Sequence, residues 1–507
     1  MKKFNYDIND VMLYFCEISK IPRMSGKEEK IANYIENFAK ENKLQYFRDV
    51  YNNVVVIKEA NKSSSSESII LQCHLDMVCE KDENSNHNFE TDSLDLYIDD
   101  DYIRARGTSL GADNGIGIAI ILSILSSKEI CHPRIEAIFT VQEETTMMGA
   151  KQIDLSVLKG NKMICLDNMS EDELLVGCAG AKIFDFEIDG EIVEKNVTEY
   201  KLIKIVMNGF RGGHSGKDIA KGRGNPIKEM ICFLEDIFSK YDITLKNIYG
   251  GKEVNVIPRE CSCEIYINNK DFNKIKQEVL NYNKKIRENI KYNENIIVCL
   301  EDVSDVDYRS FNKNTTKKVI DIINNIPSGV YYKDKYDNPI VSLNIGKIDN
   351  DIKKINLYFS LRYNKKVIEE QLEVELNRII NKYKIEYTEN ELAGYEHIGE
   401  SPFIKKCTNI YNYYFEKKPK IINMHICLEA GFFGTKIPNL DFIAIAPNIY
   451  DAHSPKERCS ISSLKKIYNY ILLILKELWL YSLYEINSYT LFEWKKYNYR
   501  KTIKNVV

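Results

Sequence analysis

The first 180 residues alternate between helix-like and strand-like spacing of hydrophobic positions. Residues 8–42 carry apolar side chains three and four positions apart, as in amphipathic helices: Val11, Phe15, Ile31, Ile35 and Phe38. Ser25, with Glu28 three residues later, predicts a capping box before the second helix. Strands are predicted for NNVVVIKEA, SIILQCHLDMV, RIEAIFTVQEE and KMICLDNMSED, and a helix for GIGIAIILSILSS. This alternation favours an α/β domain with a mixed central sheet flanked by helices.

The pattern changes after Gly180. Alternating strands such as YKLIKIVMNGF and NVIPRECSCEIYIN are separated by helices such as GNPIKEMICFLEDIFSKY, which predicts an α+β domain over residues 181–395. The segment DFIAIAPNIYDAHSPKE then returns to a strand that ends in polar side chains. We therefore predict one discontinuous domain over residues 1–180 and 396–490, an α+β domain inserted into it, and an extension over residues 491–507.

Composition and charge exclude several classes of partner. The chain has 507 residues, 28% of them charged, and a net charge of -4 without long runs of one sign, so neither nucleic acid nor a membrane surface is expected as a partner. The N-terminus lacks the apolar run of a signal peptide, and Lys476 and Glu477 interrupt the apolar stretch ILLILKELWLYSLY. The 13 cysteines are scattered and form no CxxC framework, which favours reduced thiols and a cytoplasmic location.

Acidic and histidine side chains gather where strand-like segments end. His74 and Asp76 are two positions apart at the end of an apolar run, so they are expected on one side of the chain. The full set is His74, Asp76, Asp113, Glu143, Glu144, Asp167 and His453. Imidazole nitrogens and carboxylate oxygens together suit Zn, Mn or Co, and one bridging carboxylate suits a pair of metals. The alternative is a buried histidine beside solvated acids.

Three further motifs leave alternatives open. Of Glu143 and Glu144, one can bind metal while the other acts as a general base, or both are solvated at a helix N-terminus. GTSLGADNGIGIA resembles a phosphate cradle but lacks the P-loop lysine, so its glycines are expected to bring Asp113 close to another group. His214 in GGHSG is either an oxyanion-stabilising donor or an exposed turn residue. His87, His132 and His425 are interpreted as structural or exposed.

Eight stretches resemble one family in the same order along the chain. They are CHLDMVCEK, GTSLGADNGIGIA, QEETTMMGA, LDNMSEDELLVGCAGA, GFRGGHSG, NVIPRE, CLEAGFF and APNIYDAHSPKERCSISS. Together they resemble the bacterial aminoacyl-histidine dipeptidases, also called cytosol non-specific or Xaa-His dipeptidases, within the zinc-dependent dipeptidase and aminoacylase group. The resemblance implies a catalytic di-metal domain, an inserted lid, and hydrolysis of dipeptides, Xaa-His and others, to free amino acids. Two arrangements are open: the large insert would mimic a second subunit within one chain, or the protein would form a homodimer.

The resemblance also implies a role for each site residue. His74 and Asp167 would hold one metal, Glu144 and His453 the other, and Asp113 would bridge them, with zinc expected and cobalt or manganese as alternatives. Asp76 would orient His74, and Glu143 would be the general base. His214 would lie at the scissile carbonyl, and Asn255 and Arg362 are candidates for the substrate carboxylate.

Two departures from the family pattern concern the substrate rather than the ligands. Thr146 stands where glycine is expected, and Asn168 and Met169 stand where a run beginning with serine is usual. Two alternatives remain open: an N-acyl amino acid deacylase of the same group, and a non-catalytic metal-binding relative.

Overall fold

The computed structural model describes residues 6–61, 67–196, 198–291, 295–301, 303, 307–396 and 401–485. The chain forms two compact units. Unit 1 comprises Met1–Gly177, His397–Asn423 and Phe432–Val507, and unit 2 comprises Cys178–Glu396 and Met424–Gly431. The chain enters unit 2 a second time, over the short segment Met424–Gly431, and no feature of the sequence predicts this crossing. The polar stretch 62–66 and the tail beyond residue 485 lie outside the described residues.

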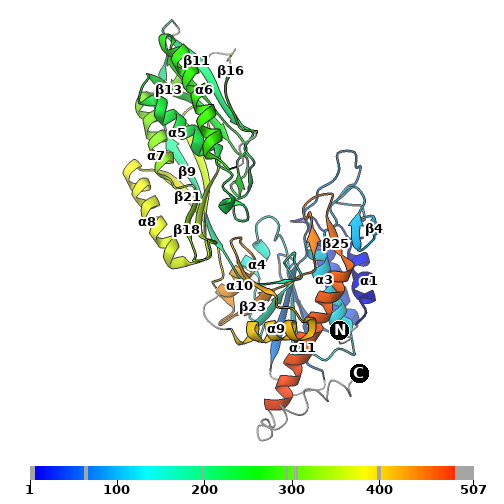
Figure 1. Ribbon diagram of the computed structural model, residues 1–507. Coiled ribbons are helices and arrows are strands. Elements are labelled where there is room, and N and C mark those ends of the chain that lie inside the picture. Colours follow the sequence, from blue (N-terminus) through cyan, green and yellow to red (C-terminus); the bar gives the residue numbers. More distant parts are fainter. Residues whose placement is uncertain are drawn as a thin grey trace. The chain divides into compact units, whose positions relative to one another are not determined.

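Unit 1 is built on an eight-stranded sheet in the order β1-β2-β6-β3-β7-β23-β8-β22 (Figure 1). Its strands are Gln45–Arg48 (β1), Val54–Lys58 (β2), Ser68–His74 (β3), Arg134–Thr140 (β6), Lys162–Cys165 (β7), Glu173–Cys178 (β8), Lys420–Met424 (β22) and Asp441–Ala444 (β23). The central strands β6, β3, β7 and β23 are parallel, whereas β1 and β2 pair antiparallel at one edge. This mixed sheet with flanking helices confirms the predicted α/β class.

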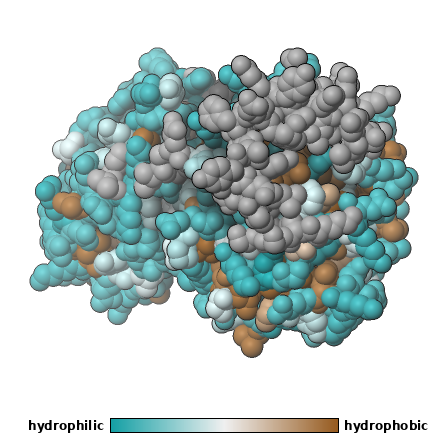
Figure 2. Space-filling view, turned by 90° about the horizontal axis from the view of Figure 1, so that it is seen from below, coloured by the Kyte–Doolittle hydropathy of each residue, from teal (hydrophilic) through white to brown (hydrophobic). Residues whose placement is uncertain are grey.

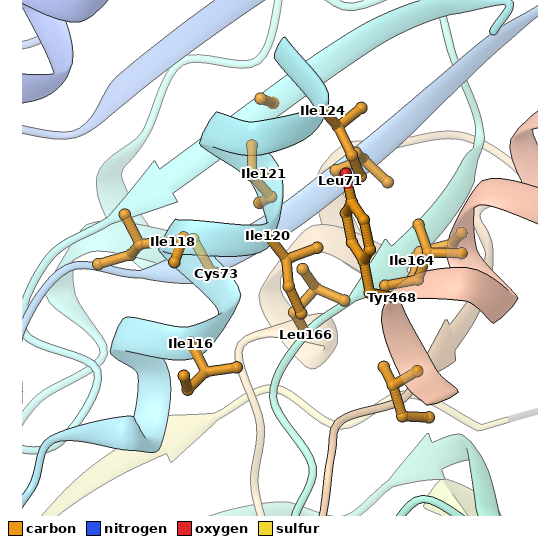
Figure 3. Close-up of a cluster of buried hydrophobic side chains, with 14 of the residues drawn as sticks. Leu71, Cys73, Ile116, Ile118, Ile120, Ile121, Ile124, Ile164, Leu166 and Tyr468 are labelled. Atoms are coloured by element: carbon orange, nitrogen blue, oxygen red, sulfur yellow. The ribbon is translucent and has the colours of Figure 1, made fainter. Parts of the chain in front are cut away.

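Helix α3 (Ala112–Ser126) forms the centre of the unit 1 core. It is apolar all around, which is typical of a helix that is covered on every side. Figure 3 shows its isoleucines beside strands β3 and β7 and beside helix α11 (Ile461–Glu485); the labelled residues are Leu71, Cys73, Ile116, Ile118, Ile120, Ile121, Ile124, Ile164, Leu166 and Tyr468. Asp113 lies at the start of α3, at a kink where its backbone angles (φ -81°, ψ 106°) are not helical.

The remaining elements of unit 1 surround this sheet. They are α1 (Asn9–Ile18), α2 (Glu29–Glu41), α4 (Met148–Gln152), α9 (Pro402–Phe415) and a small sheet of β4 (Leu96–Asp99), β5 (Tyr102–Ala105), β25 (Arg458–Ser460) and β24 (Ile449–Tyr450). Helix α10 (Ala430–Lys436) begins where the chain leaves unit 2. Within the described ranges, no helix combines the length and hydropathy required to cross a bilayer. The face in Figure 2 is mainly hydrophilic, with small hydrophobic patches.

Unit 2 contains a nine-stranded sheet, and each of its described strand pairs is antiparallel. The strands are Ile297–Glu301 (β16), Tyr200–Asn208 (β11), Cys261–Asn268 (β15), Ile243–Gly250 (β13), Pro339–Asn350 (β19), Lys354–Tyr363 (β20), Gly180–Asp189 (β9), Glu386–Leu392 (β21) and Gly329–Lys333 (β18). Helices α5 (Pro226–Phe238), α6 (Phe272–Asn289), α7 (Lys313–Asn325) and α8 (Lys366–Tyr383) share a core with it (Figure 1). The predicted α+β class of this region is confirmed. Two short ribbons complete the unit: β10 (Ile192–Glu194) with β17 (Arg309–Phe311), and β12 (Gly213–His214) with β14 (Val256–Ile257).

Candidate metal centre

The candidate ligands of unit 1 lie at one edge of its sheet. His74 is the last residue of β3, Glu143 and Glu144 follow β6, and Asp167 follows β7. These three strands are parallel neighbours, so their carboxyl ends meet at the edge where α/β folds bind ligands. Asp113 arrives from the first turn of α3, and His453 from the loop after β24.

Three groups of these side chains are close enough to hold a metal ion. They are His74 with Asp113 and Asp167, Asp113 with Glu144 and His453, and His74 with Glu143 and Glu144; within each group the ligand atoms lie within 4.8 Å of one another. The first two groups share Asp113. Their mixture of imidazole and carboxylate donors fits divalent zinc, manganese or cobalt.

Asp113 lies between the two histidines. Its Oδ1 is 3.1 Å from Nε2 of His74, and its Oδ2 is 3.2 Å from Nε2 of His453. Burial opposes ionisation of Asp113, but the contacts with His453 and His74 lower its pKa well below the usual range. Oε1 of Glu144 lies 3.1 Å from the same nitrogen of His453, Nε2. The contacts with Asp113 and Glu144 raise the pKa of His453 to about 10.

Asp76 holds two ligand-bearing segments together. One of its oxygens lies 3.4 Å from Nδ1 of His74, on the far side of the ring from Asp113. The same carboxylate accepts the backbone N–H groups of Glu143 and Glu144, each at 3.1 Å. Asp76 is fully buried, and the contacts with His74 and Ser25 overcome the effect of burial and lower its pKa. Asp76 therefore contacts both the imidazole of His74 and the turn with the two glutamates.

The predicted capping box is wrong. Helix α2 begins at Glu29 without a side-chain cap. Instead, the hydroxyl of Ser25 donates to Asp76 at 2.7 Å, and Glu28 accepts the backbone N–H groups of Gly26 at 2.8 Å and Gln142 at 3.0 Å. The buried carboxylate of Asp76 is a stronger, charged acceptor for the hydroxyl. A serine and an acid three residues apart before a helix form the same sequence pattern whether they cap the helix or bond to distant groups. The sequence therefore contains no signal that separates capping from these long-range contacts.

The two departures from the family pattern lie close to this centre. The backbone N–H of Thr146 donates to the carbonyl of Gln142 at 3.1 Å, so the turn after β6 forms with threonine in place of glycine. Asn168 is buried and lines a small cavity together with Asp113 and Asn114. Neither substitution removes a candidate ligand.

The candidate residues of unit 2 also lie together. Ribbon β12–β14 sets His214 opposite Val256, and the backbone N–H of Ser215 donates to the carbonyl of Asn255 at 2.9 Å. Nε of Arg362 donates to the hydroxyl of Ser215 at 3.1 Å. The backbone N–H groups of Gly216 and Lys217 donate to Nδ1 of His214 at 3.0 and 3.1 Å. The ring proton of neutral His214 is therefore on Nε2, where it can donate a hydrogen bond.

His425 belongs to the same part of unit 2. Its ring contacts the hydroxyl of Ser342 at 2.7 Å and the side-chain oxygen of Asn364. Burial, together with the neighbouring Arg362 and His214, lowers the pKa of His425 to about 3. His425 is thus a buried, neutral histidine, in agreement with the structural interpretation from the sequence.

Metal uptake by the protein after chelator treatment should release protons. Without metal, contacts with Asp113 and Asp76 outweigh burial and raise the pKa of His74 well above its usual value, and the pKa of His453 is about 10. Both rings are then protonated at pH 7, but a metal binds only neutral imidazole, so about two protons should leave and metal affinity should increase with pH. Calorimetric titration with zinc in buffers of different ionisation enthalpy measures this number. His87→Gln, outside the cluster, should leave it unchanged, and zinc binding without proton release would contradict the prediction.

Comparisons with known proteins agree with this geometry. The model of peptidase family M20/M25/M40 matches residues 70–477. The cytosol non-specific dipeptidase of Escherichia coli (strain K12) is 30% identical over 473 residues, which cover 92% of this chain and 96% of that protein. The crystal structure of aminoacylhistidine dipeptidase from Vibrio alginolyticus is similar with a TM-score of 0.82 and 29% identity, over 94% of this chain and 99% of that chain.

A more distant structure shares the fold alone. Aminopeptidase PepT from Bacillus cereus has a TM-score of 0.54 and 13% identity, over 93% of this chain and 99% of that chain. All the candidate ligands of unit 1 lie inside the stretch that the family model matches. The chain therefore belongs to peptidase family M20/M25/M40.

Proposed function

We propose that this protein is a metal-dependent dipeptidase that hydrolyses dipeptides, Xaa-His among them, to free amino acids. The observation that carries the proposal is the pair of three-residue groups that share Asp113, because a shared carboxylate is what a two-metal hydrolase requires. The similarity to a cytosol non-specific dipeptidase and to an aminoacylhistidine dipeptidase supports dipeptides as substrates.

Each group would hold one of two divalent cations. His74 and Asp167 would bind the first, Glu144 and His453 the second, and Asp113 both. Zinc fits this donor set best, with cobalt or manganese as alternatives. When bound, the cations would supply Lewis acidity and lower the pKa of a neighbouring water to about 7.

Glu143 is the general base in this proposal. Its backbone N–H is held by Asp76, which also contacts His74, so the base and the ligand share one anchor. Glu143 takes a proton from the attacking water while the water oxygen bonds to the peptide carbon. When the carbon–nitrogen bond breaks, Glu143 returns that proton to the leaving amine, which leaves two free amino acids.

We assign substrate recognition to the candidate residues of unit 2. The Nε2–H of His214 is a donor suited to the carbonyl oxygen that becomes negatively charged during attack. Arg362 offers a planar fork that suits a terminal carboxylate, and the side chain of Asn255 offers a further donor. Ser215 hydrogen-bonds to the backbone of Asn255 and to the side chain of Arg362, so these two residues lie close to each other.

The test is a panel of free dipeptides, including Xaa-His, beside the same dipeptides with an acetylated N-terminus. We expect cleavage of the free dipeptides, about two metals per chain, and loss of activity on chelation that added zinc restores. Cleavage of the acetylated compounds alone would identify an N-acyl amino acid deacylase instead. Two bound metals without hydrolysis of either set would indicate a non-catalytic metal-binding protein.

A cytosolic location is part of the same proposal. The Escherichia coli relative is named for the cytosol. No disulfide joins any of the 13 cysteines, all of which lie in described residues. Reduced thiols are the usual state in that compartment.

A further inference from the structure

The glycine-rich segment before α3 surrounds a buried carboxylate of the chain itself. The backbone N–H groups of Leu110 and Gly111 donate to one oxygen of Glu457, each at 2.9 Å. Those of Ala112 and Asp113 donate to the other oxygen at 2.9 and 3.3 Å. Successive N–H groups around a left-handed residue, here Gly111 with φ +62°, form an anion-binding concavity. The stretch that resembles a phosphate cradle therefore binds Glu457, which is 3% exposed.

A buried arginine holds the same segment from its carbonyl side. Nη2 of Arg23 donates to the carbonyl of Gly111, and Nη1 donates to the carbonyls of Leu75 at 3.2 Å and Asp76 at 3.0 Å. Arg23 thus ties the segment that follows His74 to the segment that carries Asp113. A side chain at position 111 would not fit, because its Cβ would come within 2.5 Å of Arg23 Nη2.

Glu457 is also close in sequence to a candidate metal ligand, His453. It lies four residues after His453, so one loop supplies a candidate ligand and the anchor of Asp113. Asp113 contacts His74 with one oxygen and His453 with the other, and small displacements of its backbone would alter both distances. Groups that orient a ligand in this way commonly change metal affinity when they are replaced.

We propose that Glu457 and Arg23 are positioning residues that set the location of Asp113 between the two metals. Glu457 acts from the N–H side of the Gly111 segment and Arg23 from the carbonyl side, and neither touches the substrate. The inference rests on the proposed role of Asp113 as the shared ligand. It extends the site to two residues whose types, in the runs IPRMS and SPKER, otherwise suggest exposed charges.

The test replaces Glu457 with glutamine, which keeps the shape but exchanges one accepting oxygen for an NH₂ group. We expect the affinity for zinc to fall about 10- to 100-fold, as is usual when a group that orients a metal ligand is lost. The visible absorption of the cobalt-substituted protein should shift, and kcat should fall while KM for a dipeptide changes little. Arg23→Lys keeps the charge but loses the forked guanidinium, and it should likewise lower zinc affinity and kcat and shift the cobalt spectrum. This variant tests the proposal if Glu457→Gln does not fold.

The control is Glu136→Gln. Glu136 is likewise a fully buried carboxylate that accepts backbone N–H groups, those of Lys159 and Gly160 at 2.9 Å, but it lies outside the ligand groups. It should lower the unfolding temperature without altering zinc affinity or the cobalt spectrum. Unchanged affinity and spectrum in Glu457→Gln, at any stability, would overturn the proposal. Because zinc binding needs no substrate, this result is independent of whether the wild type cleaves dipeptides.

Discussion

Replacement of Glu143 by glutamine should lower kcat for dipeptide hydrolysis about 10³-fold, within the usual range for loss of a general base, while two metals stay bound. Glutamine has nearly the same shape but cannot accept the proton of the attacking water. The backbone N–H of residue 143 would still donate to Asp76, so the turn that carries Glu144 should keep its position. KM should change little, since Glu143 is assigned no part in substrate binding.

Metal content and kinetics on the same preparation separate the possible roles of Glu143. Glu83→Gln, an exposed change in unit 1, is the matched control and should behave as the wild type does. Glu143 also belongs to the third candidate group, with His74 and Glu144. Loss of a metal from Glu143→Gln would therefore place Glu143 among the ligands. Two bound metals with an unchanged rate would show that another group is the base.

Much of the unit 1 site can be predicted from the sequence because it follows from the order of strands. His74, Glu143 and Asp167 each come at or just after the end of an apolar run, and runs separated by helices form parallel strands. The carboxyl ends of parallel strands share one edge, so these side chains meet whichever strand lies in the middle. Asp113 and His453 could be added because glycine-rich and strand-end loops reach the same edge.

The residues that support the ligands could not be predicted in this way. Glu28, Glu457 and Arg23 act through backbone groups that are distant in sequence, such as the amide of Gln142 and the carbonyl of Gly111. Any residue type presents those backbone groups, so no pairing pattern appears in the sequence. Glu457 stands between Lys456 and Arg458, where an acid is typical of a solvated surface. Only the folded chain distinguishes the two environments.

The shared ligand should be the most sensitive position of the centre. We expect Asp113→Ala to lose both metals and to retain less than about 10⁻³ of the wild-type dipeptidase rate, because both Lewis acids and the water they activate are lost. Asp167→Ala should lose one metal, since Asp167 belongs to only one group. Both variants remove one carboxylate. A difference of one metal per chain between them therefore shows that Asp113, unlike Asp167, serves both metal positions.

Asp113→Ala should also alter the remaining histidines in a measurable way. Asp113 contributes to the raised pKa of both His74 and His453, so its removal should lower both values in the metal-free protein. Metal per chain is measured by mass spectrometry after gel filtration, and the imidazole titrations are followed by NMR. The exposed change Asp100→Asn should leave metal content and rate unchanged. If Asp113→Ala kept two metals, or lost only as many as Asp167→Ala, the two positions would not share Asp113, and each would have to be completed by separate ligands from the same sheet edge.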